Sequence, residues 1–300
     1  MNWFKNKKIN ILLFITSIIL ILFICLKIIV IIIFTDSPSS IYVKDKINDY
    51  NEQISFIFNL SDKFKIDEIG CIDSPLCPEY KLYKIIYGNN DNKNKRKYLF
   101  ISGVHGNEPA TVYAMEIFIQ YLDSIDLLQD ITIEFMYILN PYGFEYNYMY
   151  SSSNINIDRD YLRLKAQETK IFLNNIKDEK FDTVFDFHED NSKSATGCYM
   201  FYYSRKNKNL INNMLENLRN NNVPINDNYK FMGIKANKGA LYVPLYAKII
   251  FMYLGGNAGA GLYFNKKNVE EVFVFETPTH LEMEKRIEIQ LILLKYIISN

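Results

Sequence analysis

Cysteine is scarce in this sequence, with four residues in 300, and this scarcity excludes a small scaffold held together by disulfide bonds. The fold must therefore bury a hydrophobic core, for which a hydrophobic content of 49% is ample. Cys71 and Cys77 flank a short proline-containing loop. They either form a disulfide bond or remain two thiols, because sequence spacing does not establish the geometry that the bond requires.

Net charge is also absent. Lysine plus arginine and aspartate plus glutamate each number 34, so the formal net charge is 0. Nucleic-acid recognition depends on concentrated lysine and arginine, and no basic patch of this kind occurs along the chain. We therefore predict no nucleic-acid partner.

One long segment lacks charge almost completely. Residues 9–34 carry a single charged side chain, Lys27, and roughly 20 apolar residues are enough for a helix to cross a bilayer. The segment is longer than the apolar core of a signal peptide and no A-x-A-like cleavage site follows it, so a membrane anchor is favoured over a cleaved signal peptide. Three lysines in residues 1–8 predict a cytoplasmic N-terminal tail and an extracytoplasmic remainder.

The rest of the chain divides into a polar linker, residues 35–66, and one folded domain, residues 67–300. Within the domain, runs of apolar, β-branched and aromatic residues alternate with amphipathic stretches, which predicts an α/β domain with a mixed, mostly parallel central sheet flanked by helices. The predicted strands are 81–88, 97–103, 131–139, 183–188, 197–204 and 272–276. The predicted helices are 109–122, 168–176, 209–219 and 280–298.

Two of the three histidines lie where predicted strands run into loops. His105 follows an apolar run, and Glu108 comes three residues later, where a helix begins. His188 ends the run TVFDF. Open α/β sheets bind ligands at the carboxyl ends of their strands, and two histidines with one glutamate form a catalytic zinc site that leaves one position open for water.

Four elements in this order resemble the zinc carboxypeptidase family, including its branch of succinylglutamate desuccinylases and aspartoacylases. The stretch SGVHGNEPAT resembles the first zinc motif of that family, and FDFHED resembles the second. ILNPYGFEYN with NINIDRDY resembles the Asn-Pro-x-Gly element and the substrate clamp, and VFVFETP resembles the strand with the catalytic glutamate. The resemblance implies a zinc carboxypeptidase-like fold, one Zn²⁺ held by His105, Glu108 and His188, and Glu276 as general base.

The resemblance also implies that Arg159 binds a substrate carboxylate, although a salt bridge with a neighbouring aspartate is an alternative. The family pattern Asp-x-Asn-Arg reads Asn-Ile-Asp-Arg at residues 156–159, so Asp158 replaces an amide. Family members often carry arginines shortly before this clamp, where this chain has Tyr148 and Met149. These departures predict weaker binding of an anionic substrate and put turnover in question.

A glycine-rich run at 255–261 predicts a mobile loop beside the site, and Tyr242, Tyr253 and Tyr263 surround it. Any of the three could supply the mobile phenol that the family uses near its substrate. The leading functional hypothesis is a membrane-anchored metallocarboxypeptidase that acts on a peptide with a free C-terminus. The alternatives are an N-acyl amino acid amidase and a non-catalytic, membrane-tethered binding protein.

Overall fold

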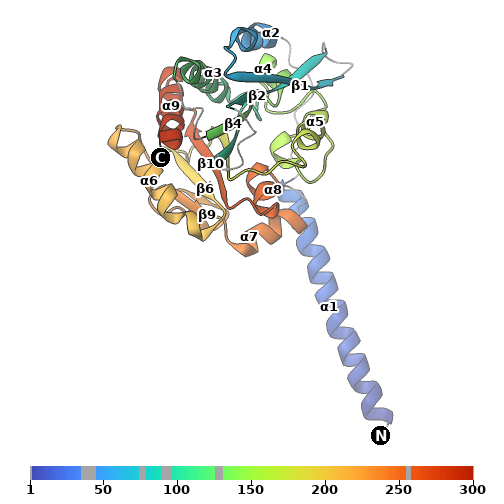
Figure 1. Ribbon diagram of the computed structural model, residues 1–300. Helices are drawn as coiled ribbons and strands as arrows, with labels where there is room; N and C mark the ends of the chain where they lie inside the picture. The colour runs from blue at the N-terminus through green and yellow to red at the C-terminus, as the bar shows by residue number, and fades with distance from the viewer. Residues whose placement is uncertain are drawn as a thin grey trace.

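An eight-stranded mixed sheet lies at the centre of the folded domain (Figure 1). The computed structural model describes residues 2–34, 45–73, 79–88, 96–125, 131–254 and 258–299. The strand order across the sheet is β1-β2-β4-β3-β5-β10-β6-β9. The strands are β1 (Phe64–Ile72), β2 (Tyr80–Tyr87), β3 (Arg96–Ile101), β4 (Ile131–Met136), β5 (Thr183–Asp190), β6 (Tyr199–Tyr202), β9 (Ala240–Tyr242) and β10 (Glu271–Pro278).

The four central strands, β4, β3, β5 and β10, run parallel to one another, while β1, β2 and β6 add antiparallel pairings. This arrangement confirms the predicted mixed, mostly parallel sheet. Central strands of this kind are covered on both faces, which explains why their sequences read as almost continuous apolar runs. Phe100, Phe185 and Phe273 are fully buried along the middle of the sheet, and their rings contact neighbouring aromatic rings.

Helices cover both faces of the sheet. In Figure 1, α3 (Pro109–Ser124), α6 (Lys208–Asn220) and α9 (Met283–Ser299) lie along one side, where α9 packs against both α3 and α6. On the other side are α5 (Gln167–Asn175), which contacts β1, and α8 (Ala260–Lys266), which contacts β5 and β10. Shorter elements complete the domain: α2 (Tyr50–Ile54), η1 (Ser55–Asn59), α4 (Pro141–Tyr146), η2 (Ile157–Arg159), η3 (Arg205–Asn207), β7 (Lys230–Phe231), β8 (Ile234–Lys235), α7 (Leu245–Ile249) and the π-helix η4 (Ile250–Leu254).

The domain begins earlier in the chain than the sequence indicated. The predicted linker, residues 35–66, has its first ten residues outside the described part of the chain, but its remainder is folded onto the domain. Tyr50, Ile54 and Ile57 are buried in the core, and the Tyr50 hydroxyl donates a hydrogen bond to the Lys81 carbonyl oxygen at 2.5 Å. These apolar residues are widely spaced among polar ones, so the segment resembled a linker, whereas tertiary packing makes it part of the core.

The N-terminal helix α1 (Asn2–Phe34) extends away from the domain (Figure 1). Its segment Ile11–Ile29 has a mean hydropathy of 3.0 and, by length and composition, could be a membrane span or a signal sequence. Its side chains there are exposed, as expected of a helix whose partner is not this domain. Cys77 lies outside the described residues, so the structure does not distinguish a disulfide bond with Cys71 from two separate thiols.

Candidate active site

The candidate site is built where β3, β5 and β10 end at one edge of the sheet. His105 follows β3 in a short loop, Glu108 is the N-cap residue of α3, and His188 lies near the end of β5. Gly106 lets this loop pass close to the backbone of Gly143, because a Cβ atom at residue 106 would lie 1.8 Å from the Gly143 carbonyl carbon. A larger residue at this position would therefore push His105 and Glu108 out of place.

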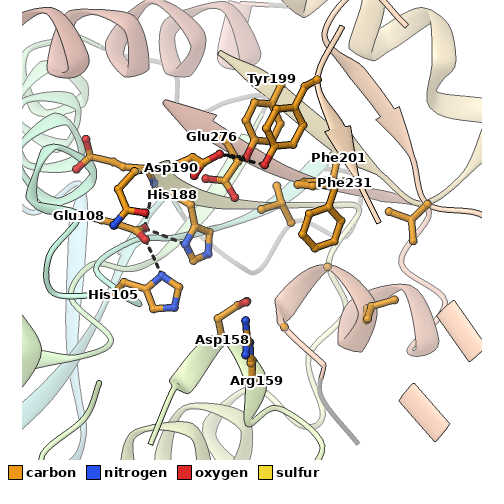
Figure 2. A pocket seen from close by; sticks show the side chains of 18 of the residues that line it. His105, Glu108, Asp158, Arg159, His188, Asp190, Tyr199, Phe201, Phe231 and Glu276 are labelled. Carbon is orange, nitrogen blue, oxygen red and sulfur yellow. Dashed lines mark hydrogen bonds and ion pairs between the residues drawn. The ribbon is translucent and has the colours of Figure 1, made fainter. Parts of the chain in front are cut away.

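The two imidazoles converge on the carboxylate of Glu108 (Figure 2). The Nδ1 atom of His105 lies 2.6 Å from Oε1 of Glu108, and the Nδ1 atom of His188 lies 3.0 Å from Oε2. All three ligand atoms lie within 4.8 Å of one another, and all three residues are buried. The structure thus brings together the three residues that the sequence predicted as metal ligands.

Each histidine has a second polar contact on the far side of its ring. Nε2 of His105 lies 3.0 Å from Oδ1 of Asn156, and Nε2 of His188 lies 3.0 Å from Oδ2 of Asp186. Such contacts orient a metal-binding imidazole and hold Nδ1 free for the ion. These roles were not predicted from the sequence, although Asp186 is two residues before His188 and therefore on the same face of β5.

The electrostatics of the site call for a cation. Burial would raise the pKa of Glu108, but its interactions with His105 and His188 outweigh burial and lower that pKa to about 2. Burial would lower the pKa of His188, but Asp186 and Glu108 together raise it well above its ordinary value. Each imidazole therefore binds a proton more tightly than it does in water, and a divalent cation would displace such protons, since metal binding to histidine releases them.

Glu276 lies on β10 directly opposite His188 on the neighbouring parallel strand β5. Its side chain lines the same cavity as the three candidate ligands, as Figure 2 shows. Burial raises the pKa of Glu276 well above its ordinary range, with the negative charges of Glu108 and Asp190 adding to that effect and the His188 charge opposing it. A carboxylate in these surroundings is a stronger base than one in water.

Asp158 and Arg159 lie on η2 and both line the cavity (Figure 2). Burial raises the pKa of Asp158, while His188 and His105 act to lower it. Gly259 packs directly on this carboxylate, because a Cβ atom there would lie 2.1 Å from Oδ1 of Asp158. The described end of the glycine-rich run, which the sequence placed beside the site, therefore contacts the predicted clamp. The nearby Asp160 accepts hydrogen bonds from the backbone N–H groups of Lys165 and Ala166.

The cavity has a volume of about 360 Å³ and is polar at one end and apolar at the other. Arg159 is the only lysine or arginine among the described residues that line it. The apolar wall consists of Phe201, Phe231, Ile234, Val243, Phe251, Leu262 and Val274. This wall was not predicted from the sequence, because its members come from seven separate elements and loops.

Three tyrosines line the cavity, and none is among the three that the sequence analysis named. Tyr199 and Tyr229 stack with ring centroids 3.8 Å apart, and both hydroxyls donate hydrogen bonds to Asp190, while Tyr203 is almost fully buried. Tyr242 and Tyr263 do not line the cavity, and the side chain of Tyr253 lies outside the described part of the chain. Met149 also lines it, where family members often carry an arginine, and offers no strong hydrogen-bond donor.

Comparisons with known proteins agree with this architecture. Residues 94–230 match the family described as the succinylglutamate desuccinylase/aspartoacylase catalytic domain. This range includes the three candidate metal ligands and Arg159, and ends before Glu276. A search of curated protein sequences finds no match.

Several solved structures share the fold. One is a Shewanella denitrificans OS217 protein assigned as a metallopeptidase, which is 15% identical with a TM-score of 0.68 over 83% of this chain and 88% of that one. A metallo-carboxypeptidase from Burkholderia cenocepacia is 13% identical with a TM-score of 0.61 over 83% and 67%. Bovine thrombin-activatable fibrinolysis inhibitor, solved with a tick carboxypeptidase inhibitor, is 13% identical with a TM-score of 0.60 over 87% and 98%. Residues 94–230 are thus similar to the succinylglutamate desuccinylase/aspartoacylase catalytic domain, and the solved structures show that the chain has a zinc carboxypeptidase-like fold.

Proposed function

We propose that this protein is a membrane-anchored zinc carboxypeptidase that hydrolyses the C-terminal amide bond of a peptide. The observation that carries the proposal is the convergence of His105, Glu108 and His188 in one cavity that Glu276 also lines. Arg159 lies in the same cavity and offers a guanidinium for the free carboxylate of the substrate.

The residues present fit one Zn²⁺ per chain. Two imidazole nitrogens and one carboxylate form the donor set of catalytic zinc sites, and the contacts from Asn156 and Asp186 would support the imidazoles. When bound there, zinc would polarise the scissile carbonyl and make the attacking water acidic near neutral pH. The other steps belong to side chains of this chain.

Glu276 supplies the proton transfers. Its carboxylate takes a proton from the attacking water and then donates it to the leaving amine, so one group acts first as general base and then as general acid. The raised pKa of Glu276 suits its step as proton donor to the leaving amine, and a nearby divalent cation would lower that pKa and so favour the carboxylate that acts as base. The apolar wall of the cavity would contact the side chain of the C-terminal residue. Peptides that end in phenylalanine are therefore suitable substrates for the assay.

We expect Arg159→Ala to raise KM for a peptide with a free C-terminus about 10- to 100-fold with little change in kcat. A hydrogen bond to a charged group contributes about 1.5–3 kcal/mol, and the carboxylate is bound equally in substrate and transition state. The matched variant Asp158→Asn removes the negative charge beside Arg159 and should lower KM for the same peptide. The measurement is a Michaelis–Menten comparison of free and amidated peptides. Equal loss on both substrates in Arg159→Ala would contradict a carboxylate-binding role.

An N-acyl amino acid amidase is the second candidate, and one observation favours it. The family that matches residues 94–230 is named for two amidases, the succinylglutamate desuccinylases and the aspartoacylases. Both substrate types present a free carboxylate to Arg159, so this residue does not separate them. An assay of N-acyl amino acids alongside the peptides separates the two functions, because an amidase would cleave the N-acyl amino acids and not the peptides.

We further propose that α1 spans the cytoplasmic membrane with residues 1–8 inside and the domain outside. The support is the apolar segment of α1 and the lysines that precede it. A reporter that works only outside the cytoplasm should therefore be active when fused after Asn300. Replacing the three N-terminal lysines by glutamate should lower this activity, because the lysines keep the N-terminal tail inside. If a reporter that works only in the cytoplasm is active at the same position, the proposed orientation is wrong. That result would favour the amidase, whose family substrates are cytosolic metabolites.

A further inference from the structure

The domain exposes a cluster of large apolar side chains on the short helix α7. Leu245 is 70% exposed, Tyr246 is 57% exposed and Ile249 is 45% exposed. Ile249 lies four positions after Leu245 and three after Tyr246, so its side chain neighbours both of theirs on the helix surface. Exposed apolar residues that occur singly need no explanation, but three within five residues mark a contact surface.

The surface extends onto the hairpin of β7 and β8. Met232, at the tip of this hairpin, is 48% exposed. The Phe231 ring stacks against that of Phe251 in η4 at a centroid distance of 6.2 Å, so the hairpin lies beside the helical segment. Lys230 and Lys235 flank the tip with exposed ammonium groups. An apolar face bordered by lysines is the pattern of a segment that lies in the interface of a bilayer.

The position of α1 identifies what covers this surface. Helix α1 contacts η4, and Figure 1 shows the domain end of α1 beside the orange segment that contains α7 and α8. The apolar run of α1 ends at Phe34, which is five residues beyond Ile29 and hence roughly 7.5 Å farther along the helix axis at 1.5 Å per residue. A bilayer spanned by α1 therefore ends close to η4.

We infer that α7 and the tip of the β7–β8 hairpin form a membrane-contact surface that lies in the lipid interface next to α1. This inference rests on the proposed anchoring by α1, and it holds for either orientation of the chain. Leu245, Ile249 and Met232 enter the edge of the acyl region, and the Tyr246 ring lies at the level of the headgroups, where tyrosine is enriched.

The same segment forms part of the candidate active site. Phe251, two residues after Ile249, lines the apolar wall of the cavity, and so does Val243, two residues before Leu245. One face of this segment therefore contacts lipid while the residues on either side of it line the cavity. Contact of α7 with the membrane would therefore hold Val243 and Phe251, and with them this part of the apolar wall, next to the lipid surface.

Quenching of a single tryptophan by brominated phosphatidylcholine tests the inference on the full-length chain. The natural Trp3 is replaced by phenylalanine, and Leu245→Trp places the probe on α7. Phe58→Trp is the matched control, because Phe58 is 60% exposed on η1, which directly follows α2 at the end of the domain far from α1 in Figure 1. Purified variants are reconstituted into vesicles and isolated by flotation.

We expect the tryptophan at residue 245 to lose most of its emission in brominated vesicles and to emit at shorter wavelength than the one at residue 58, which should not be quenched. A chain that floats with the vesicles while both tryptophans remain unquenched would overturn the membrane-contact surface and leave the anchor intact. A chain that does not float would overturn both. Zinc-dependent hydrolysis by the same preparations tests the proposed activity separately.

Discussion

Glu276→Gln should lower kcat about 10²- to 10⁴-fold, because this is the usual contribution of general acid–base catalysis. The glutamine keeps the size and polarity of the side chain but cannot accept a proton from water. We expect zinc content and the melting temperature to stay near the wild-type values, since Glu276 is not a proposed metal ligand. The measurements are kcat on a peptide with a free C-terminal phenylalanine and the zinc content of the same sample.

Glu271→Gln is the matched control for this experiment. Glu271 begins the same strand β10, but its carboxylate pairs with Arg96 and accepts a hydrogen bond from Thr183 at the opposite end of the strand. Its replacement should leave kcat close to wild type. If Glu276→Gln retains full activity, the proposed general base is wrong. If the zinc-loaded wild type cleaves neither peptides nor acyl amino acids, the membrane-tethered binding protein becomes the better account, with Asp158 and Met149 as its physical reasons.

His188→Ala should abolish stoichiometric zinc binding and with it all turnover. The full-length chain in detergent should contain about one zinc per molecule, and loss of one of three protein ligands leaves too few donors to hold the ion. Chelation should lower the melting temperature of the wild type, since a ligand bound to the folded state stabilises it, but should not change that of the variant. Metal analysis and thermal unfolding measure both effects.

Three further variants distinguish the metal ligands from other residues. His280→Ala replaces the third histidine, which is exposed on the turn after β10, and should keep the full zinc content. Asp186→Asn and Asn156→Ala should keep the site but weaken zinc affinity by about 10- to 100-fold, which is the usual effect of losing a residue that orients a ligand. Equal zinc content in wild type and His188→Ala would refute the proposed metal site.

Much of the fold was predictable because its signals are local. The central strands are short apolar runs, and α3 begins at Pro109, a residue that suits the first turn of a helix. The structure places β3 at Arg96–Ile101 and α3 at Pro109–Ser124, within two residues of the predictions of 97–103 and 109–122 at each boundary. Weaker signals failed. The edge strand β1 and the short helices α2, α7 and α8 lie in segments whose apolar residues are too few or too irregular to show a period.

By itself, the sequence determined that His105, Glu108 and His188 would meet. Parallel strands carry their following loops to the same edge of a sheet, so residues at the ends of neighbouring strands converge even when 83 positions separate them, as with His105 and His188. The roles assigned to these residues and to Glu276 remain predictions that the experiments above test.

Only the tertiary structure decided how the site is completed. The contact between Asn156 and His105, the packing of Gly259 on Asp158 and the apolar wall of the cavity each join segments that no local period relates. The same is true of residues 45–66, whose few apolar side chains become core only because the sheet supplies a surface for them. Local periodicity indicates which face of an element is apolar, but it does not indicate which distant element covers that face. That pairing sets the shape of the cavity, the support of the candidate ligands and the surface beside α1.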